Sequence, residues 1–143
     1  MAIPVRVKRL REGARLPERA TEGATGYDLY ACLDAPLTVG PEPVRVPTGV
    51  AIEIEAGYDV QIRPRSGLSA KGVMVTYGTI DADYRGELLV SMYTLPYRGP
   101  HEVNDGDRIA QLVISHAVAA EITVADELSE TARGAGGHGS TGR

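Results

Sequence analysis

The sequence contains no phenylalanine and no tryptophan, so its core must be built mainly from Val, Ile, Leu and Ala side chains. Its single cysteine, Cys32, excludes an intramolecular disulfide framework and a zinc site made of several cysteines. No apolar run reaches the roughly 18 residues of a membrane-spanning helix, and residues 1–20 lack the apolar segment of a signal peptide. We therefore expect a soluble, cytoplasmic protein with no membrane partner.

Lysine is also scarce, and the net charge is negative. Fifteen Lys and Arg side chains stand against nineteen Asp and Glu side chains, which gives a formal net charge of −4, and only Lys8 and Lys71 are lysines. A general nucleic-acid-binding protein needs a basic surface, so we expect no stable nucleic-acid partner. The thirteen arginines suit bidentate contacts to phosphate or carboxylate groups. This pattern favours a small anionic ligand held at a local positive site.

What the sequence does contain is typical of a turn-rich β protein. The 143 residues suffice for one ordinary domain. Short β-branched and apolar runs are separated by Gly, Pro, Asn and Asp, which predicts an all-β sandwich or barrel. One helical turn is expected at 66–71, capped by Ser66 and stopped by Gly72, while 125–132 fits a second turn or a loop equally well. The predicted strands are residues 4–9, 44–55 with a turn at 47–49, 58–63, 73–76, 87–95, 108–116 and 117–124.

The last thirteen residues differ from the rest, because five are glycine and none is large and apolar. We therefore divide the chain into a β domain at 1–130 and a glycine-rich arm at 131–143. Such a segment is either a disordered tail or a flexible arm that orders on a ligand. For the second reading, Arg133 supplies charge, glycines let backbone N–H groups approach an anion, and Ser140 and Thr141 supply hydroxyl groups. Together these are the parts of a phosphate clamp.

Residues 63–67, RPRSG, place Ser66 where a predicted strand meets the predicted helical turn. Backbone N–H groups at such a junction can bind an anion, and Arg65 adds a guanidinium group suited to phosphate. The alternative is an ordinary helix cap flanked by surface arginines. The segment therefore predicts either a phosphate contact or a plain turn.

Residues 78–87, GTIDADYRGE, place two carboxylates two positions apart. Asp81 and Asp83 would face the same side of a regular strand, but they need not do so in an irregular turn framed by glycines. One of them could be a general base for water. The alternative is an acidic turn held by Arg85.

Further along the chain, residues 106–108 predict an ordinary hairpin turn. Gln111 follows in an otherwise apolar strand and must find hydrogen-bond partners if it is buried. His101 is expected in a loop and His116 near a strand end, both with structural roles. The sequence pattern does not predict a catalytic triad of Ser66, Asp81 and a histidine.

Taken in order, these segments resemble the five sequence motifs of the trimeric dUTPases, the deoxyuridine triphosphate nucleotidohydrolases. The resemblance implies a jelly-roll-like β-barrel or sandwich protomer in a threefold homotrimer, with active sites shared between subunits. The implied reaction converts dUTP and water into dUMP and pyrophosphate by in-line attack on the α-phosphorus, which limits uracil in DNA and supplies dUMP for thymidylate synthesis. The motifs are ATGYDLYA (24–31), RPRSGLS (63–69), GTIDADYRGE (78–87), GDRIAQLV (106–113) and RGAGGHGSTG (133–142).

The resemblance also implies roles for the residues at matching positions. Asp81 would orient the attacking water and meet the sugar 3′-hydroxyl, and Gln111 would contact the α-phosphate or the water. Tyr84 would pack on the deoxyribose and leave no room for a 2′-hydroxyl. Backbone groups of a hairpin would read uracil, and the residues of that hairpin are Thr79, Ile80 and Leu89.

The phosphates and the metal have implied partners as well. Asp28 would meet Mg²⁺ through coordinated water, in keeping with the few protein ligands that Mg²⁺ usually takes. The metal would span the triphosphate and offset its charge. The implied phosphate-binding residues are Arg65, Ser66 and Gly67 in the second motif, and Arg133, Ser140 and Thr141 in the arm, where His138 would stack on the base.

Three positions depart from the family pattern. His138 stands where the arm usually carries Phe, Val75 where many bacterial members have Asn, and Thr94 where Asn is common. A histidine ring can still stack on a base, although with less apolar area. The valine removes one side-chain contact to uracil but leaves backbone readout intact.

Two other readings belong to different classes. A dCTP deaminase, or a bifunctional deaminase–dUTPase, shares the fold, but those chains are generally longer and lack this tail. A non-catalytic nucleotide-binding homologue is the second alternative. The presence of Asp81, Gln111 and Arg133 argues against it.

Overall fold

The computed structural model describes residues 2–139 and 142, and short antiparallel strands dominate it. Two helical turns complete it, α1 (Ser66–Ala70) and the 3-10 turn η1 (Pro96–Arg98). The predicted all-β class is therefore confirmed. The strands are β1 (Arg6–Arg9), β2 (Tyr27–Tyr30), β3 (Leu37–Val39), β4 (Val44–Pro47), β5 (Val50–Glu53), β6 (Tyr58–Arg63), β7 (Val73–Val75), β8 (Gly78–Ile80), β9 (Leu89–Thr94), β10 (His101–Val103) and β11 (Arg108–His116).

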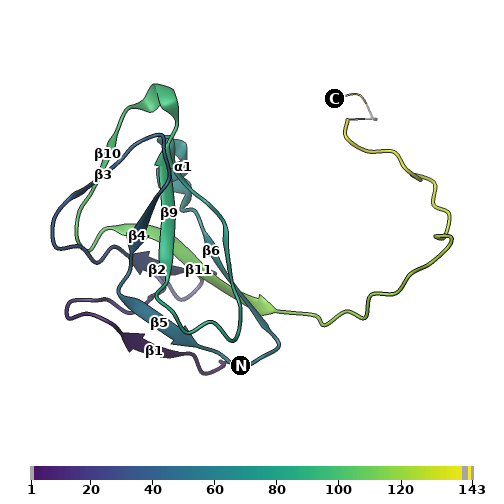
Figure 1. Ribbon diagram of the computed structural model, residues 1–143, viewed down its shortest axis with the longest axis horizontal. Coiled ribbons are helices and arrows are strands. Elements are labelled where there is room, and N and C mark those ends of the chain that lie inside the picture. The colour runs from purple at the N-terminus through teal and green to yellow at the C-terminus, as the bar shows by residue number, and fades with distance from the viewer. Residues whose placement is uncertain (1, 140–141, 143) are drawn as a thin grey trace.

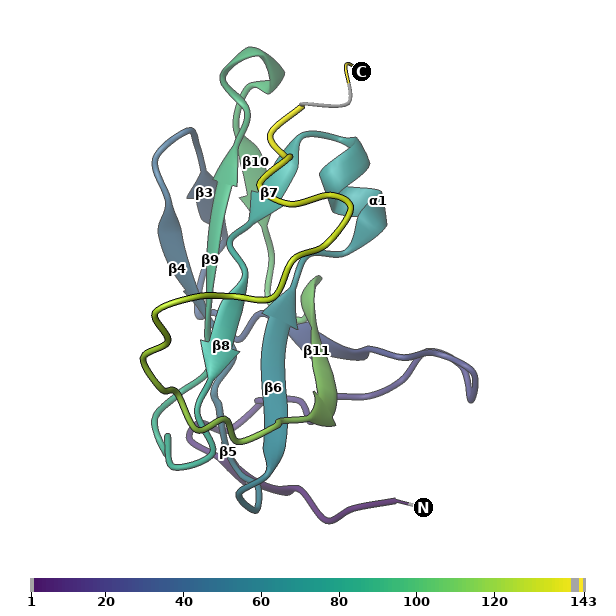
Figure 2. The same cartoon turned by 90° about the vertical axis from the view of Figure 1, so that its right-hand side faces the viewer.

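Antiparallel pairing arranges these strands in four small sheets. The widest has the order β2-β11-β6-β8 and the next β4-β9-β7, while β1 pairs with β5 and β10 with β3. Because β11 lies between β2 and β6, Gln111 stands opposite both Asp28 and Arg63. The sheets wrap around one interior in a jelly-roll-like arrangement (Figures 1 and 2).

The core is made of the small apolar residues that the composition demands. On β6, Val60 and Ile62 are buried while the alternating Gln61 and Arg63 are only half-buried, as expected for a strand with one face inward. Each buried Val, Leu or Ile contributes about 1.5–3 kcal/mol relative to an exposed one. The fully buried large side chains are Leu29, Val39, Val46, Val50, Val60, Val73, Leu88, Val90, Met92, Val103, Ile109 and Leu112.

Most of the predicted strands are confirmed. Those at 4–9, 58–63, 73–76, 87–95 and 108–116 correspond to β1, β6, β7, β9 and β11, and the turn at 47–49 separates β4 from β5. Sequence reasoning misses β2, β3, β8 and β10, each of only three or four residues, which is too short to show alternation. His101, expected in a loop, begins β10.

The strand predicted at 117–124 is wrong for this chain. The backbone N–H of Ala117 donates to the Gly57 carbonyl at 2.9 Å, and no strand follows among the described residues. A strand needs a partner for its backbone groups, and this segment leaves the body of the protein. Figure 1 shows the C-terminal tail, here residues 117–139, running away from the sheets, and these residues form no helix and no strand.

Ser66 is not the cap of the helical turn, contrary to prediction. Arg65 occupies the cap position in an extended conformation, and no side chain caps the turn. The first helical hydrogen bond runs from the Ser69 N–H to the Arg65 carbonyl, at 3.1 Å, which places Ser66 inside the turn. Gly72 ends it at a φ of 79°, as predicted for a glycine stop.

The turn at 106–108 is not a hairpin. Gly106 has a φ of 81°, and the Asp107 N–H donates to the Asn104 carbonyl at 3.1 Å. However, β10 and β11 on either side of the turn belong to different sheets. The segment therefore carries the chain from one sheet to another.

Among the described residues, no helix is long and apolar enough to cross a membrane.

Candidate active site

Asp28 on β2 lies between two arginines. Its Oδ1 is 3.4 Å from Arg65 Nε, and its Oδ2 is 3.8 Å from Arg108 Nη1. The Asp28 side chain is only 13% exposed, so this carboxylate is largely shielded from water by its neighbours. The arrangement joins the first, second and fourth motifs around one negative charge.

Arg65 connects the start of α1 to β11. Its Nη1 donates to the Arg108 carbonyl at 3.3 Å, while its Nε faces Asp28. These contacts hold the guanidinium at the entry of the helical turn that contains Ser66 and Gly67. The N–H groups of the first helical turn have no intrahelical acceptor and stay free for an anion.

Gln111 finds the partner that its position requires. Its Nε2 donates to the Pro64 carbonyl at 2.9 Å, directly before Arg65. Its side chain is half-buried and lies over the backbone of Gly26. The amide is therefore fixed beside the second motif by a main-chain acceptor.

The third motif comprises β8 and most of the turn that leads to β9. Asp81 and Asp83 are exposed, and the Tyr84 N–H donates to the Asp81 carbonyl at 3.0 Å. Arg85 does hold this turn, but its Nη1 donates to the Ala82 carbonyl at 2.7 Å, a backbone acceptor. The Asp81 carboxylate makes no hydrogen bond or ion pair within the described part of the chain, which leaves it available to a ligand.

Tyr84 is held against the same turn. Its hydroxyl donates to the Glu87 carbonyl at 2.8 Å, and its ring passes so close to Gly86 that a Cβ there would overlap it. The residue is 42% exposed. Part of the tyrosine surface therefore remains accessible to a ligand.

The residues predicted to read uracil do not form one hairpin in the structure, contrary to the prediction. Thr79 and Ile80 lie on β8, which pairs with β6, whereas Leu89 begins β9 in the other large sheet. No ladder joins β8 to β9 among the described residues, because the acidic turn carries the chain between sheets. Since β8 is an edge strand, half of its backbone groups still lack a ladder partner.

The chain brings together the first, second and fourth motifs but not the others. β8 is two strands from β11 in the sheet, and at about 4.8 Å per strand this separates the third motif by roughly 10 Å. In the tail, Arg133 bonds only locally, with Nε donating to the Gly136 carbonyl at 2.7 Å, and His138 is exposed with a φ of 50°. Ser140 and Thr141 lie outside the described residues.

Sequence reasoning misses three residues that shape this region. Arg108 is the second cation on Asp28, and Gly26 makes room for Gln111. Glu87 accepts from the Gly49 N–H at 2.8 Å and from Arg11 Nη2 at 2.9 Å, so it ties the third motif to the body. Gly26 and Arg108 stand inside quoted motifs, but only the strand register shows what they touch.

The Asp28 cluster, a carboxylate with two guanidinium groups and a fixed amide, has the groups that proteins use to bind phosphorylated ligands. The exposed Asp81 carboxylate, which stands apart from this cluster in one chain, is a candidate base for hydrolysis. Together they point to the class of enzymes that hydrolyse phosphorylated ligands. Residues 12–142 match a sequence model of the dUTPase family. The chain belongs to the dUTPase family.

Curated relatives share about half of their residues with this chain. The deoxyuridine 5′-triphosphate nucleotidohydrolase of Desulfotalea psychrophila is 51% identical over 135 residues, covering 92% of this chain and 89% of the relative. The protein of the same name from Hydrogenobaculum is 51% identical over 140 residues, covering 95% and 96%.

Solved structures of dUTPases have a similar fold. A variant dUTPase of Staphylococcus bacteriophage 80alpha with dUpNHpp superposes with a TM-score of 0.86 at 29% identity, covering 99% of this chain and 100% of the phage chain. A variant dUTPase from phage phi11 of S. aureus, described with a structural Mg(II) ion, gives a TM-score of 0.80 at 28% identity, covering 87% and 98%.

The dUTPase family uses Mg²⁺, and the residues present fit an indirect contact. The described residues contain no group of three or more His, Cys, Asp or Glu side chains that could cage a metal ion. Asp28 shares its two oxygens with arginines, which suits a carboxylate that meets a hydrated ion rather than a direct ligand. Mg²⁺ keeps several waters and takes most other ligands from substrate phosphates, so Asp28 would hold it through coordinated water.

Proposed function

We propose that this protein hydrolyses dUTP to dUMP and pyrophosphate by attack of water on the α-phosphorus. The observation that carries the proposal is the cluster in which Arg65 contacts Asp28 while Gln111 is fixed at Pro64, in a chain with the family's five motifs. A cation and an amide at one point suit the α-phosphate of a triphosphate. The reaction lowers dUTP and supplies dUMP.

Asp81 is the base in this proposal. Its carboxylate is exposed and free of protein partners in the described residues, so it can accept a hydrogen bond from water and from the sugar 3′-hydroxyl. The exposed part of Tyr84 packs on the deoxyribose. The free edge of β8, at Thr79 and Ile80, offers backbone donors and acceptors to the uracil ring, with Leu89 beside them.

Ser66 and Gly67 at the helical turn join Arg65 on the phosphates. Mg²⁺, when bound, offsets the charge of the triphosphate and of the departing pyrophosphate, and Asp28 holds it through water. The glycine-rich arm, residues 131–143, closes over the nucleotide, with Arg133, Ser140 and Thr141 on the γ-phosphate. His138 stacks on the base.

We further propose that three chains assemble with shared active sites. The separation of the third and fifth motifs from the Asp28 cluster supports this, because one chain alone leaves the candidate site in pieces. The tail also exposes apolar side chains that a monomer would leave in water. These are Val118, Ile122, Val124 and Leu128, all at least 88% exposed.

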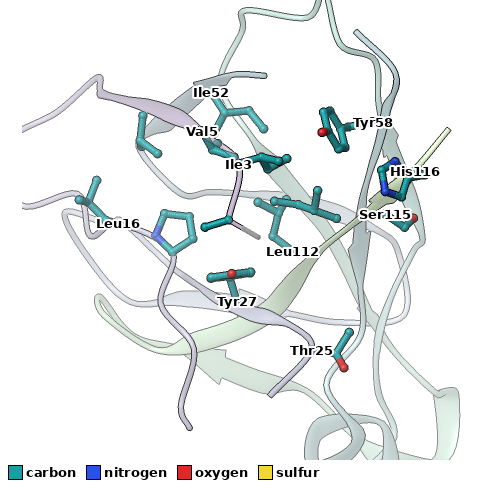
Figure 3. Close-up of a pocket in the computed structure, with 14 residues that line it drawn as sticks. Ile3, Val5, Leu16, Thr25, Tyr27, Ile52, Tyr58, Leu112, Ser115 and His116 are labelled. Carbon is teal, nitrogen blue, oxygen red and sulfur yellow. The ribbon is translucent and has the colours of Figure 1, made fainter. Parts of the chain in front are cut away.

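A matching apolar surface lies on the body of the protein. A groove of about 840 Å³ lies between β1, β5 and the end of β11, and Figure 3 shows Ile3, Val5 and Ile52 around it with Leu112. It is distinct from the Asp28 cluster and holds none of the predicted site residues. An apolar groove and an apolar tail in the same chain support association between copies, and the family resemblance gives the number three.

The substrate assay decides the function. Purified protein with Mg²⁺ is expected to release pyrophosphate from dUTP and far less from dTTP, dCTP or UTP. Release of ammonia from dCTP would overturn the proposal.

A nucleoside triphosphate substrate and a single free thiol at Cys32 also favour a location in the cytoplasm. Fractionation of the cells would test this location.

One pair of variants tests the base. Asp81→Ala is expected to abolish turnover while nucleotide binding persists, because it removes the group that orients water. Asp83→Ala is the matched control, since Asp83 is an exposed carboxylate in the same turn. Near-native turnover by Asp81→Ala would remove Asp81 from its proposed role.

A further inference from the structure

Arg98, in η1, uses all three of its guanidinium nitrogens in hydrogen bonds. Its Nε donates to the Lys71 carbonyl at 2.9 Å, and its Nη1 to the Pro100 carbonyl at 2.8 Å. Its Nη2 donates to His101 Nδ1 at 3.3 Å. Lys71 is the residue that caps the C-terminal end of α1. Arg98 therefore joins the end of the helical turn to the start of β10.

The stem of Arg98 reinforces this junction. Gly72, with a φ of 79°, passes so close that a Cβ there would be 3.0 Å from Arg98 Cγ. The Leu95 N–H, one residue before η1, donates to the Gly72 carbonyl at 3.0 Å. The two residues that follow α1, Lys71 and Gly72, thus contact η1 and the residue before it through two hydrogen bonds and one side-chain contact.

Few contacts fix the position of α1. It has five residues, no side-chain cap at its start, no basic residue in its last turn and no buried residue. Leu68 packs half-buried against the core, and Arg65 ties the start of the turn to Asp28. A helix this short does not persist on its own, so tertiary contacts determine where it lies. Its first residues are Ser66 and Gly67, directly after Arg65. A contact at its end therefore affects where these residues stand.

His101 makes the junction sensitive to protonation. A guanidinium group only donates, so the bond to Nδ1 requires that this nitrogen carry no proton. The pKa of His101 is below its ordinary value of 6.5, first because burial disfavours the charged ring and then because Arg98 repels it. Lys71 lowers this pKa as well, and Asp107 raises it. The neutral ring therefore persists at neutral pH, and acid breaks the contact.

We propose that Arg98 is a positioning residue for the phosphate-binding turn at Arg65–Gly67, and that neutral His101 holds Arg98 in place, so that triphosphate affinity falls when His101 takes a proton. This inference rests on the proposed function, because it assumes that the turn meets phosphates. Arg98 touches no reacting atom. Its effect passes through the Lys71 carbonyl and the backbone of α1.

The test compares two ligands of the full-length protein between about pH 8 and pH 5, the range in which histidines titrate. One is a non-hydrolysable imido analogue of dUTP, and the other is deoxyuridine, which lacks phosphates. In wild-type protein, acid is expected to weaken binding of the analogue about fivefold more than binding of deoxyuridine. This is the effect of losing one modest hydrogen bond. The triphosphate also titrates in this range, so a second protein is needed to isolate His101.

His101→Asn is that protein. Its side-chain oxygen can accept from Arg98 at every pH but cannot take a proton, so the extra loss of affinity in acid is expected to vanish. His101→Phe removes the acceptor and is expected to show weakened analogue binding already at pH 8. Equal pH profiles for wild type and His101→Asn would overturn the proposal.

Arg98→Lys completes the test. Lysine keeps the charge but cannot span three acceptors, so analogue affinity is expected to fall about tenfold, the effect of one charge-assisted hydrogen bond. The affinity of Arg98→Lys for deoxyuridine is expected to stay constant. The control is Arg45→Lys, at an exposed position on β4, and it is expected to keep both affinities. Equal losses for both ligands would indicate general destabilisation and overturn a positioning role. Hydrolysis of dUTP by wild type at pH 8 tests the proposed function separately.

Discussion

The backbone of Gly26 passes directly beneath the side chain of Gln111. A Cβ atom at residue 26 would lie 3.0 Å from Gln111 Cβ and would overlap its Oε1. The glycine therefore creates the space in which Gln111 reaches the Pro64 carbonyl. A residue with no functional group of its own sets the position of a candidate catalytic amide.

Gly26→Ala is expected to lower kcat at least about tenfold, because the added methyl group displaces Gln111 and misplacement of a positioned group costs one to two orders of magnitude. Steady-state kinetics with dUTP measure this. Gly23→Ala is the matched control, since a Cβ there meets nothing within 4 Å. If both alanine variants kept the wild-type rate, Gln111 would not need its observed position.

Asp28→Asn is expected to raise the Mg²⁺ concentration needed for half-maximal activity about tenfold, the usual effect of losing an outer partner of a metal. The amide removes the negative charge between Arg65 and Arg108 and leaves two cations facing each other. Titration of activity with Mg²⁺ measures the shift. Asp34→Asn, at an exposed position outside the site, is expected to leave the curve unchanged.

Two buried threonines offer a paired test of stability. Both are 1% exposed, but the Thr48 hydroxyl donates to the Leu88 carbonyl at 2.6 Å, whereas Thr94 Oγ1 has no partner among the described residues. Thr48→Val is expected to lower the free energy of unfolding by about 1–3 kcal/mol because a buried carbonyl loses its donor. Thr94→Val removes an unsatisfied hydroxyl and is expected to be neutral or stabilising.

Urea unfolding at one fixed protein concentration measures both variants, because any association between chains makes stability depend on concentration. A large loss in Thr94→Val would show that its hydroxyl has a partner in the assembled protein.

The sequence predicts the long strands well because each carries a recognisable apolar pattern. In β6 and β9, every second side chain is buried, whereas β11 is a nearly continuous apolar run. β3 and β10 hold three residues each, and their pairing depends on a partner far along the chain. Residues 117–124 carry the same apolar signal but find no neighbour within the chain, which a local pattern does not reveal.

For the candidate site, the sequence supplies the residues but not their neighbours. Arg65 and Asp28 stand 37 positions apart, and only the register of β2, β11 and β6 brings them to 3.4 Å. The contact between Arg98 and Lys71 likewise depends on η1 meeting the end of α1. Motifs predict which side chains matter, whereas sheet topology decides which of them meet.

Two truncations separate the roles of the tail. Removal of 131–143 is expected to reduce turnover severely while the assembly stays intact, because the lost residues carry charge and glycine but no large apolar side chain. Removal of 117–143 also deletes Val118, Ile122 and Val124, each worth about 1.5–3 kcal/mol when buried. The mass in solution is then expected to fall from three times 15.2 kDa toward that of one chain.

Mixing inactive chains tests whether the active sites are shared. One partner carries Asp81→Ala and the other lacks residues 131–143, so neither homotrimer holds both the base and the arm. If these groups come from different chains, co-expression is expected to restore activity to about a quarter of the sites, because random assembly in a symmetric trimer satisfies two independent conditions of one half each. If each site takes both groups from one chain, no mixture regains activity. Asp83→Ala in place of Asp81→Ala is the control, since its own chains keep the base and the arm and stay active at every mixing ratio.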